Sequence, residues 1–251
     1  MTNIVFVHGA WHGGWCWQKV TALLNPSDFE IYTPSLTGTG DKAHLNKYLD
    51  PWVIDLNLHI QDIVQLITYE DLWDVVLVGH AYAGMVITGV ADICPGRLSN
   101  LVYINGVVPK SGESMLDQLE AVRGPVFTQW IRSRLTDGDG FLPAPASRQE
   151  ISERWGITKG ADLEWVYSKI TPHPSASFSQ KIAIKAGIRD GLSTSFVGSS
   201  ESGFESVIAK VRALNWDMHY IESGHDPMIT NPEEVSNILL NIVGSRSNCS
   251  N

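Results

Sequence analysis

The sequence of 251 residues has the length of one ordinary domain with room for an inserted segment. Its 27 acidic and 18 basic residues give a net charge of −9 without a Lys/Arg cluster, which argues against nucleic acid and anionic membranes as partners. Apolar runs are only strand-length and the N-terminus enters a strand at once, so we expect no membrane span, no signal peptide and a cytoplasmic protein. Three distant cysteines without a C-x-x-C pair predict neither a disulfide framework nor a zinc site.

Short apolar strands alternate with helical patterns along most of the chain. We expect strands at Ile4–Val7, Glu30–Thr33, Val75–Gly79, Leu101–Asn105, Thr194–Gly198 and Met218–Glu222. The helices between them are expected at Trp17–Leu24, Asp55–Tyr69, Ala83–Ile93, Phe204–Leu214 and Pro232–Val243. This alternation predicts the α/β class, with a mostly parallel sheet covered by helices on both faces.

One long segment interrupts the alternation. It holds several short amphipathic helical patterns, separated by prolines, and no convincing strand. We predict a helical cap over 109–189, inserted into a core made of 1–108 and 190–251. Phe127 and Trp130 in this cap are candidate walls for an apolar ligand, although simple packing of small helices also explains aromatic residues there.

The most informative segment is Gly79–Gly84, which reads Gly-His-Ala-Tyr-Ala-Gly. It joins an all-apolar strand to a helix, as the nucleophile elbow G-x-S-x-G does. Ala81 stands where that pattern has its serine. A methyl group cannot attack a carbonyl carbon, so the reactive oxygen of the elbow is missing.

Two further motifs accompany the elbow. Val7–Trp15 reads Val-His-Gly-Ala-Trp-His-Gly-Gly-Trp after the first strand, and Gly224–Met228 reads Gly-His-Asp-Pro-Met near the end. Together the three motifs resemble the α/β-hydrolase superfamily, especially small bacterial esterase-like hydrolases related to plant methyl esterases and hydroxynitrile lyases. The resemblance covers the whole chain. It implies an α/β-hydrolase fold, a small-molecule substrate, and no metal or organic cofactor.

The resemblance also implies roles for individual residues. It gives Ala81 the nucleophile position and His225 the position of the catalytic base. The backbone N–H groups of Ala10 and Tyr82 would form the oxyanion hole, which does not depend on side-chain identity. Trp11 and His12, in the glycine-rich loop, and the Tyr82 ring are candidates for substrate contacts, with core packing as the alternative explanation.

The acid of the triad has two candidates. Asn105 ends the strand that follows the elbow helix, where relatives carry an aspartate. An amide can accept a hydrogen bond from a histidine, but it cannot balance an imidazolium charge. Glu201 is the only acid at the turn after the penultimate strand, and it is equally well explained as a solvated loop carboxylate. The sequence leaves the choice between Asn105 and Glu201 open.

Three functions follow from these observations. The favoured one is a Ser-His hydrolase of a small, largely apolar ester, lactone or amide, inactivated by a serine-to-alanine change at position 81. The second is a natural lyase or cyclase that uses His225 as its acid/base, and the departures at Asn105 and Gly106 favour it. The third is a ligand-binding protein without chemistry. We expect a monomer or a homodimer.

Overall fold

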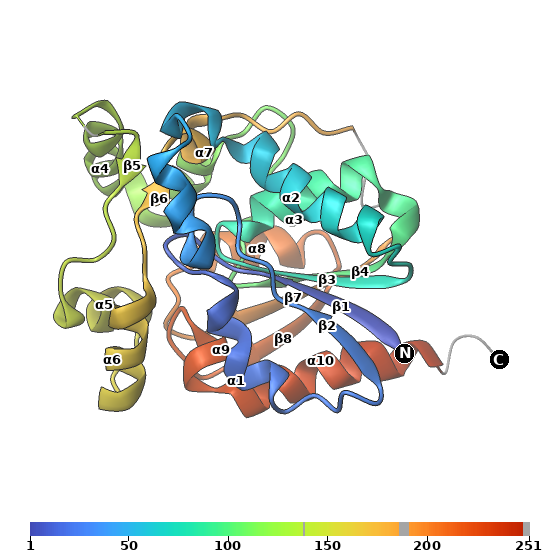
Figure 1. Cartoon of the computed structure of the whole chain (residues 1–251). Coiled ribbons are helices and arrows are strands. Elements are labelled where there is room, and N and C mark those ends of the chain that lie inside the picture. Colours follow the sequence, from blue (N-terminus) through green and yellow to red (C-terminus); the bar gives the residue numbers. More distant parts are fainter. Residues whose placement is uncertain (138, 186–190, 248–251) are drawn as a thin grey trace.

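A six-stranded sheet forms the centre of the molecule (Figure 1). The computed structural model describes residues 1–137, 139–185 and 191–247. The strand order is β2-β1-β3-β4-β7-β8, and all neighbours in this sheet are parallel. The strands are β1 Thr2–Val7, β2 Phe29–Tyr32, β3 Val75–His80, β4 Leu98–Ile104, β7 Ser193–Ser199 and β8 Asp217–Ile221. The predicted α/β class is therefore confirmed.

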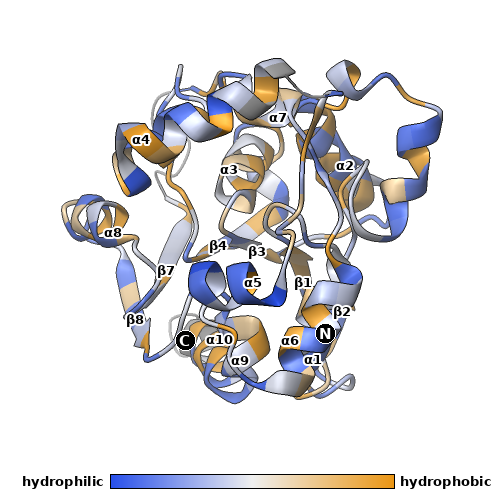
Figure 2. Ribbon diagram, turned by 90° about the vertical axis from the view of Figure 1, so that its left-hand side faces the viewer, coloured by the Kyte–Doolittle hydropathy of each residue, from blue (hydrophilic) through white to orange (hydrophobic). Residues whose placement is uncertain are grey.

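Helices cover both faces of this sheet. In Figures 1 and 2, α2 and α3 lie together on one face, and α1, α9 and α10 lie on the other. The helices outside the 109–189 segment are α1 Gln18–Thr21, α2 Leu56–Tyr69, α3 Ala83–Ile93, α8 Glu205–Arg212, α9 Pro227–Thr230 and α10 Pro232–Ser247, with 3-10 turns at Gly14–Trp17, Gly40–Lys47, Pro51–Val53 and Pro95–Arg97. Asp55 caps α2 by accepting a hydrogen bond from the N–H of Leu58 at 2.9 Å.

The first helix is shorter than its pattern predicts. The expected Trp17–Leu24 divides into a 3-10 turn, the four residues of α1, and a last turn in which the N–H of Leu24 bonds the carbonyl oxygen of Thr21 at 3.2 Å. The N–H of Leu23 likewise bonds the carbonyl oxygen of Val20 at 3.0 Å, so the last turn is held by i→i−3 bonds and the α-helical bonding ends early.

The elements between β4 and β7 are α4 Met115–Asp137, β5 Phe141–Leu142, α5 Arg148–Trp155, α6 Gly160–Lys169, β6 His173–Pro174 and α7 Ala176–Ser179. The helices α4, α5 and α6 lie at the carboxyl ends of the strands, at the left of Figure 1. The backbone of α4 breaks at Gly124, where φ is 80° and a proline follows. The predicted end of the cap at 189 and the return to the core at 190 lie outside the described residues, so these bounds stay predictions.

Two of the three cysteines are described. Cys16 is buried, Cys94 is half-buried, and both are free thiols, whereas Cys249 lies outside the described residues. Within the described chain, no helix is long and apolar enough to cross a membrane.

Candidate active site

Ala81 occupies a strained turn between β3 and α3. Its φ is 50°, in the left-handed region that residues with a side chain rarely adopt. Its N–H donates to the carbonyl oxygen of Ile104 at 3.2 Å, and its own carbonyl oxygen accepts from the N–H groups of Gly84 and Val107, both at 3.1 Å. A side chain on Gly84 would overlap the Val107 carbonyl oxygen, so the turn requires glycine there. The geometry of a nucleophile elbow is present with a methyl group at its tip.

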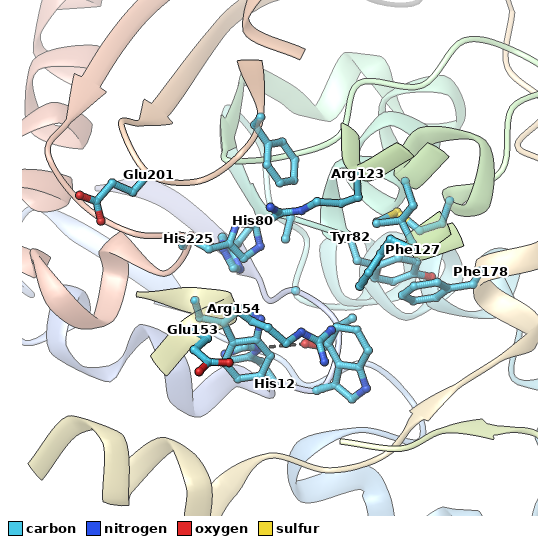
Figure 3. A pocket seen from close by; sticks show the side chains of 18 residues that line it. His12, His80, Tyr82, Arg123, Phe127, Glu153, Arg154, Phe178, Glu201 and His225 are labelled. Carbon is cyan, nitrogen blue, oxygen red and sulfur yellow. Dashed lines mark hydrogen bonds between the residues drawn. The ribbon is translucent and has the colours of Figure 1, made fainter. Parts of the chain in front are cut away.

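A cavity of about 270 Å³ opens over this turn (Figure 3). The sequence-predicted site residues that line it are Ala10, Trp11, His12, Ala81, Tyr82, Phe127, Glu201 and His225. Trp130 and Asn105 do not line it. Trp130 is 39% exposed, and its ring centroid lies 5.8 Å from that of Phe127.

Two residues that line the cavity have backbone N–H groups without an acceptor among the described residues. These residues are Ala10 and Tyr82. Tyr82 directly precedes α3, where the helix dipole adds positive potential. The Tyr82 ring is buried, its hydroxyl lies 2.9 Å from Nδ1 of His59, and it stacks on Phe178 at 5.6 Å. Both N–H groups are therefore available to a ligand oxygen.

His225 is held in the loop after β8 by backbone and ring contacts. Its N–H donates to the carbonyl oxygen of Trp155 at 2.9 Å. Its ring stacks on Phe204 at 5.2 Å and lies 4.9 Å from the ring of His80. Burial, together with the neighbouring His80, lowers the pKa of His225 to about 3, so its imidazole is neutral at pH 7. Its Nδ1 has no hydrogen-bond partner among the described residues.

Asn105 bonds the backbone beside the His225 ring and makes no hydrogen bond to the ring itself. Its Oδ1 accepts from the N–H of Ser199, and its Nδ2 donates to Oγ of Ser199 and to the carbonyl oxygen of His225, all at 2.9 Å. A backbone N–H can only donate and a carbonyl oxygen can only accept, so these partners fix the orientation of the amide. A carboxylate at this position would place an acceptor against the His225 carbonyl oxygen.

Glu201, the other predicted acid, also stays away from the His225 ring. It is exposed at the edge of the cavity, and its carboxylate points away from His225 in Figure 3. Its N–H donates to the carbonyl oxygen of Ser223 at 3.1 Å. Neither predicted acid therefore hydrogen-bonds the imidazole in this structure.

Sequence reasoning assigned no role to Asp226, which is fully buried and hydrogen-bonded to His12. Its Oδ2 lies 3.2 Å from Nε2 of His12, whereas its Oδ1, 3.3 Å from Nε2 of His80, has no hydrogen-bond partner among the described residues. Nδ1 of His12 lies 2.8 Å from the carbonyl oxygen of Ala10, so both ring nitrogens of His12 face acceptors and both donate. Its adjacency to His225 in Gly-His-Asp-Pro-Met was the only sequence signal.

His12 and Asp226 form a buried ion pair. Burial opposes the charged form of His12, but the charge and hydrogen bond of Asp226 outweigh it and raise the pKa of His12. Burial likewise opposes the carboxylate, yet His12 lowers the pKa of Asp226. The pair ties the loop that carries the Ala10 N–H to the loop that carries His225.

One group among the described residues has the composition of a metal site. Ligand atoms of His80, His225 and Asp226 all lie within 4.8 Å of one another. Two histidines and a carboxylate suit several transition metals. The Asp226 carboxylate is already paired with His12, so a cation bound there would compete with that pair.

The parallel sheet, the strained elbow and the cavity above it define an α/β-hydrolase scaffold. A model of the alpha/beta hydrolase family matches residues 4–238, and the chain belongs to this family. The chain is 32% identical to the carbendazim hydrolyzing esterase of Nocardioides sp. strain SG-4G over 250 residues, which covers 95% of this chain and 98% of that one. It is also 32% identical over 134 residues to a pheophorbidase of Raphanus sativus, covering 49% and 46% of the two chains.

Solved structures share the fold. An extracellular α/β-hydrolase from a Paenibacillus species superposes with a TM-score of 0.82 at 19% identity, covering 96% of this chain and 99% of that one. Tomato methylketone synthase I, complexed with 2-tridecanone, superposes with a TM-score of 0.76 at 18% identity, covering 97% and 98%. At these identities the likeness concerns the fold alone.

Proposed function

We propose that this protein binds a small, largely apolar carbonyl compound and that His225 transfers a proton on it without a covalent acyl intermediate. The observation that carries the proposal is Ala81, whose turn presents a methyl group where acyl transfer requires a nucleophile. The other parts of a carbonyl site surround it. They are the unpartnered N–H groups of Ala10 and Tyr82 and the neutral imidazole of His225.

These groups suit proton abstraction beside a carbonyl. The Ala10 and Tyr82 N–H groups would stabilise the negative charge that develops on the carbonyl oxygen. His225 would take the proton from the neighbouring carbon or hydroxyl group and return it later in the reaction. Elimination, aldol-type cleavage and cyclisation share this step, which places the reaction in the lyase or cyclase class. A base with a pKa of about 3 is weak, so the substrate must be activated.

Asn105 supports the same proposal independently of Ala81. Serine hydrolases orient their histidine and balance its charge with a carboxylate. Here the amide of Asn105 is committed to Ser199 and to the His225 carbonyl oxygen. The nearest buried carboxylate, Asp226, is committed to His12. An imidazolium at His225 therefore lacks the partner that repeated acyl transfer needs.

A serine-type hydrolase with its nucleophile replaced is the second candidate. Identity of 32% to an esterase over nearly the whole chain, together with an intact elbow backbone, favours it. Under this alternative, Ala81→Ser restores turnover of an ester such as p-nitrophenyl acetate. Under our proposal, Ala81→Ser hydrolyses this ester no faster than the unchanged protein, because Asn105 cannot balance the charge on His225.

The proposed function is tested by deuterium exchange. Methyl 3-oxooctanoate, a neutral compound with an acidic C–H group, is incubated in D₂O and its exchange is followed by NMR. We expect the protein to accelerate exchange, His225→Ala and His225→Gln to remove the acceleration, and exposed His44→Ala to retain it. Ester turnover by Ala81→Ser without accelerated exchange would establish the hydrolase instead. If the compound binds but neither deuterium exchange nor ester hydrolysis is accelerated, the protein is a ligand-binding protein.

A further inference from the structure

The cavity contains charged side chains that the proposed chemistry does not use. They are Arg123, Glu153, Arg154 and Glu201. Arg154 already has partners within the protein. It forms an ion pair with Glu150 at 2.8 Å and lies over the ring of Trp11 at 5.1 Å. Its charge is therefore already balanced by a neighbour on α5.

Arg123 forms no salt bridge. In the described part of the chain, the arginines that pair with a carboxylate within 4 Å are Arg97, Arg132, Arg148 and Arg154. Burial and the charge of Arg154 lower the pKa of Arg123, and the charge of Glu205 only partly opposes them. Glu153 and Glu201 are exposed, and their carboxylates point away from Arg123 in Figure 3. The two acids at the cavity edge therefore form no ion pair with Arg123.

Arg123 is nevertheless held in place. It precedes the break in α4 and reaches toward His225 and His80 in Figure 3. Its Nη2 donates to the carbonyl oxygen of Ser202 at 2.8 Å, and a side chain on Gly203 would overlap the guanidinium group. The guanidinium thus bridges the cap segment and the loop after β7.

A fixed guanidinium that lines an aromatic cavity without a salt-bridge partner favours an anionic ligand. Only one of its donors is used by Ser202, so the remaining donors can form the paired bonds that carboxylates accept. The charge of Arg123 also contributes to lowering the pKa of His225, which shows that the two groups interact. A ligand carboxylate would offset that charge and make His225 a better base.

We propose that Arg123 binds the carboxylate of the ligand, so that the substrate class is an apolar carbonyl compound that carries an acid group. This inference rests on the proposed function of the same cavity. The carboxylate would lie against Arg123, the carbonyl oxygen against the Ala10 and Tyr82 N–H groups, and the apolar part against the aromatic wall that includes Phe178.

Calorimetric binding of two probes of equal length tests this assignment. Octanoate carries the charge and octanamide is its neutral counterpart. We expect octanoate to bind more tightly, and Arg123→Met to weaken octanoate about tenfold while changing octanamide less than about twofold. Arg123→Lys should restore part of the affinity. Arg132→Met, which removes an exposed arginine of the same helix, should change neither.

Equal binding of the two probes, or equal weakening of both by Arg123→Met, would overturn the assignment. A thermal melt of each variant confirms that it is folded. The exchange of neutral methyl 3-oxooctanoate reports on His225 independently of Arg123. Intact exchange without octanoate selectivity therefore rejects only the role of Arg123. Octanoate selectivity without His225-dependent exchange rejects the proposed function and leaves an anion-binding cavity.

Discussion

The side-chain Nδ2 of Asn105 donates a hydrogen bond to the backbone carbonyl oxygen of His225 at 2.9 Å. This bond joins the end of β4 to the loop of the proposed base. It explains why an amide suits this position, since Nδ2 can donate where a carboxylate could not. Asn105 is a positioning residue that holds the backbone of His225 and leaves the ring free of a carboxylate.

Asn105→Asp should destabilise the protein. The change sets a carboxylate oxygen against the buried carbonyl oxygen of His225, which can only accept, and this costs roughly 2–4 kcal/mol. Urea unfolding measures the free energy. Asn3→Asp is the control, because it removes one exposed bond to the carbonyl oxygen of Trp73. Equal stability of Asn105→Asp and the unchanged protein would contradict the described role of the amide.

Asp226→Asn should destabilise the protein more strongly. It leaves the buried His12 without its counterion, and breaking a buried pair from one side costs about 3–5 kcal/mol. Nitrogen NMR should show a higher pKa of His12 in the unchanged protein than in the variant, because Asp226 raises it. Asp71→Asn, which breaks an exposed pair with Arg97, should change stability little. The same pKa of His12 in both proteins would be inconsistent with the ion pair.

Stability should fall as the pH drops below 6.5. Burial lowers the pKa of His8 and His225 to about 3 and that of His80 to about 4, so below pH 6.5 the unfolded chain binds protons that the folded chain does not. At pH 5, proton binding by each of these histidines in the unfolded chain lowers the free energy of unfolding by about 2 kcal/mol. His12 acts in the opposite direction, since its raised pKa stabilises the fold below 6.5 and this contribution is lost as pH rises. Thermal melts from pH 8 to pH 5 measure the net effect of these histidines on stability. A Tm that rises toward pH 5 would refute the predicted loss of stability.

Gly84→Ala should disrupt the elbow. The added methyl group would overlap the carbonyl oxygen of Val107, a backbone atom that cannot move without shifting the loop after β4. We expect a loss of about 3 kcal/mol or more, within the range of severe core strain. Gly96→Ala meets no atom within 4 Å and should be neutral in the same urea unfolding series. Equal stability of the two variants would show that the turn tolerates a side chain.

Much of the fold could be predicted because the strands carry local signals. The four apolar residues that begin β3 are typical of a parallel strand buried on both faces, and the turn after it is fixed by its small residues. The break in α4 depends on Gly124 and the proline after it. This signal lies in the sequence, but helical periodicity alone does not show that it interrupts the helix.

The candidate site was less predictable outside its motifs. Residues at the carboxyl ends of parallel strands meet at one edge, so the motif positions could be expected to converge. Arg123 and Phe204 reach His225 only through the way the chain folds back beyond β4 and β7, which no local pattern encodes. The direction of the Asn105 amide likewise depends on Ser199, a residue distant in sequence.

The most direct test of the central claim is the rate of deuterium exchange in methyl 3-oxooctanoate as a function of pH. We expect His225-dependent acceleration from pH 8 to pH 6, where the fold is least affected, with no loss near pH 6.5, because the pKa of His225 is about 3. His225→Gln should reduce the rate to that of buffer, and Ala81→Ser should leave it largely unchanged. Acceleration that is absent in the unchanged protein and accompanied by a burst of p-nitrophenol from Ala81→Ser would contradict the account.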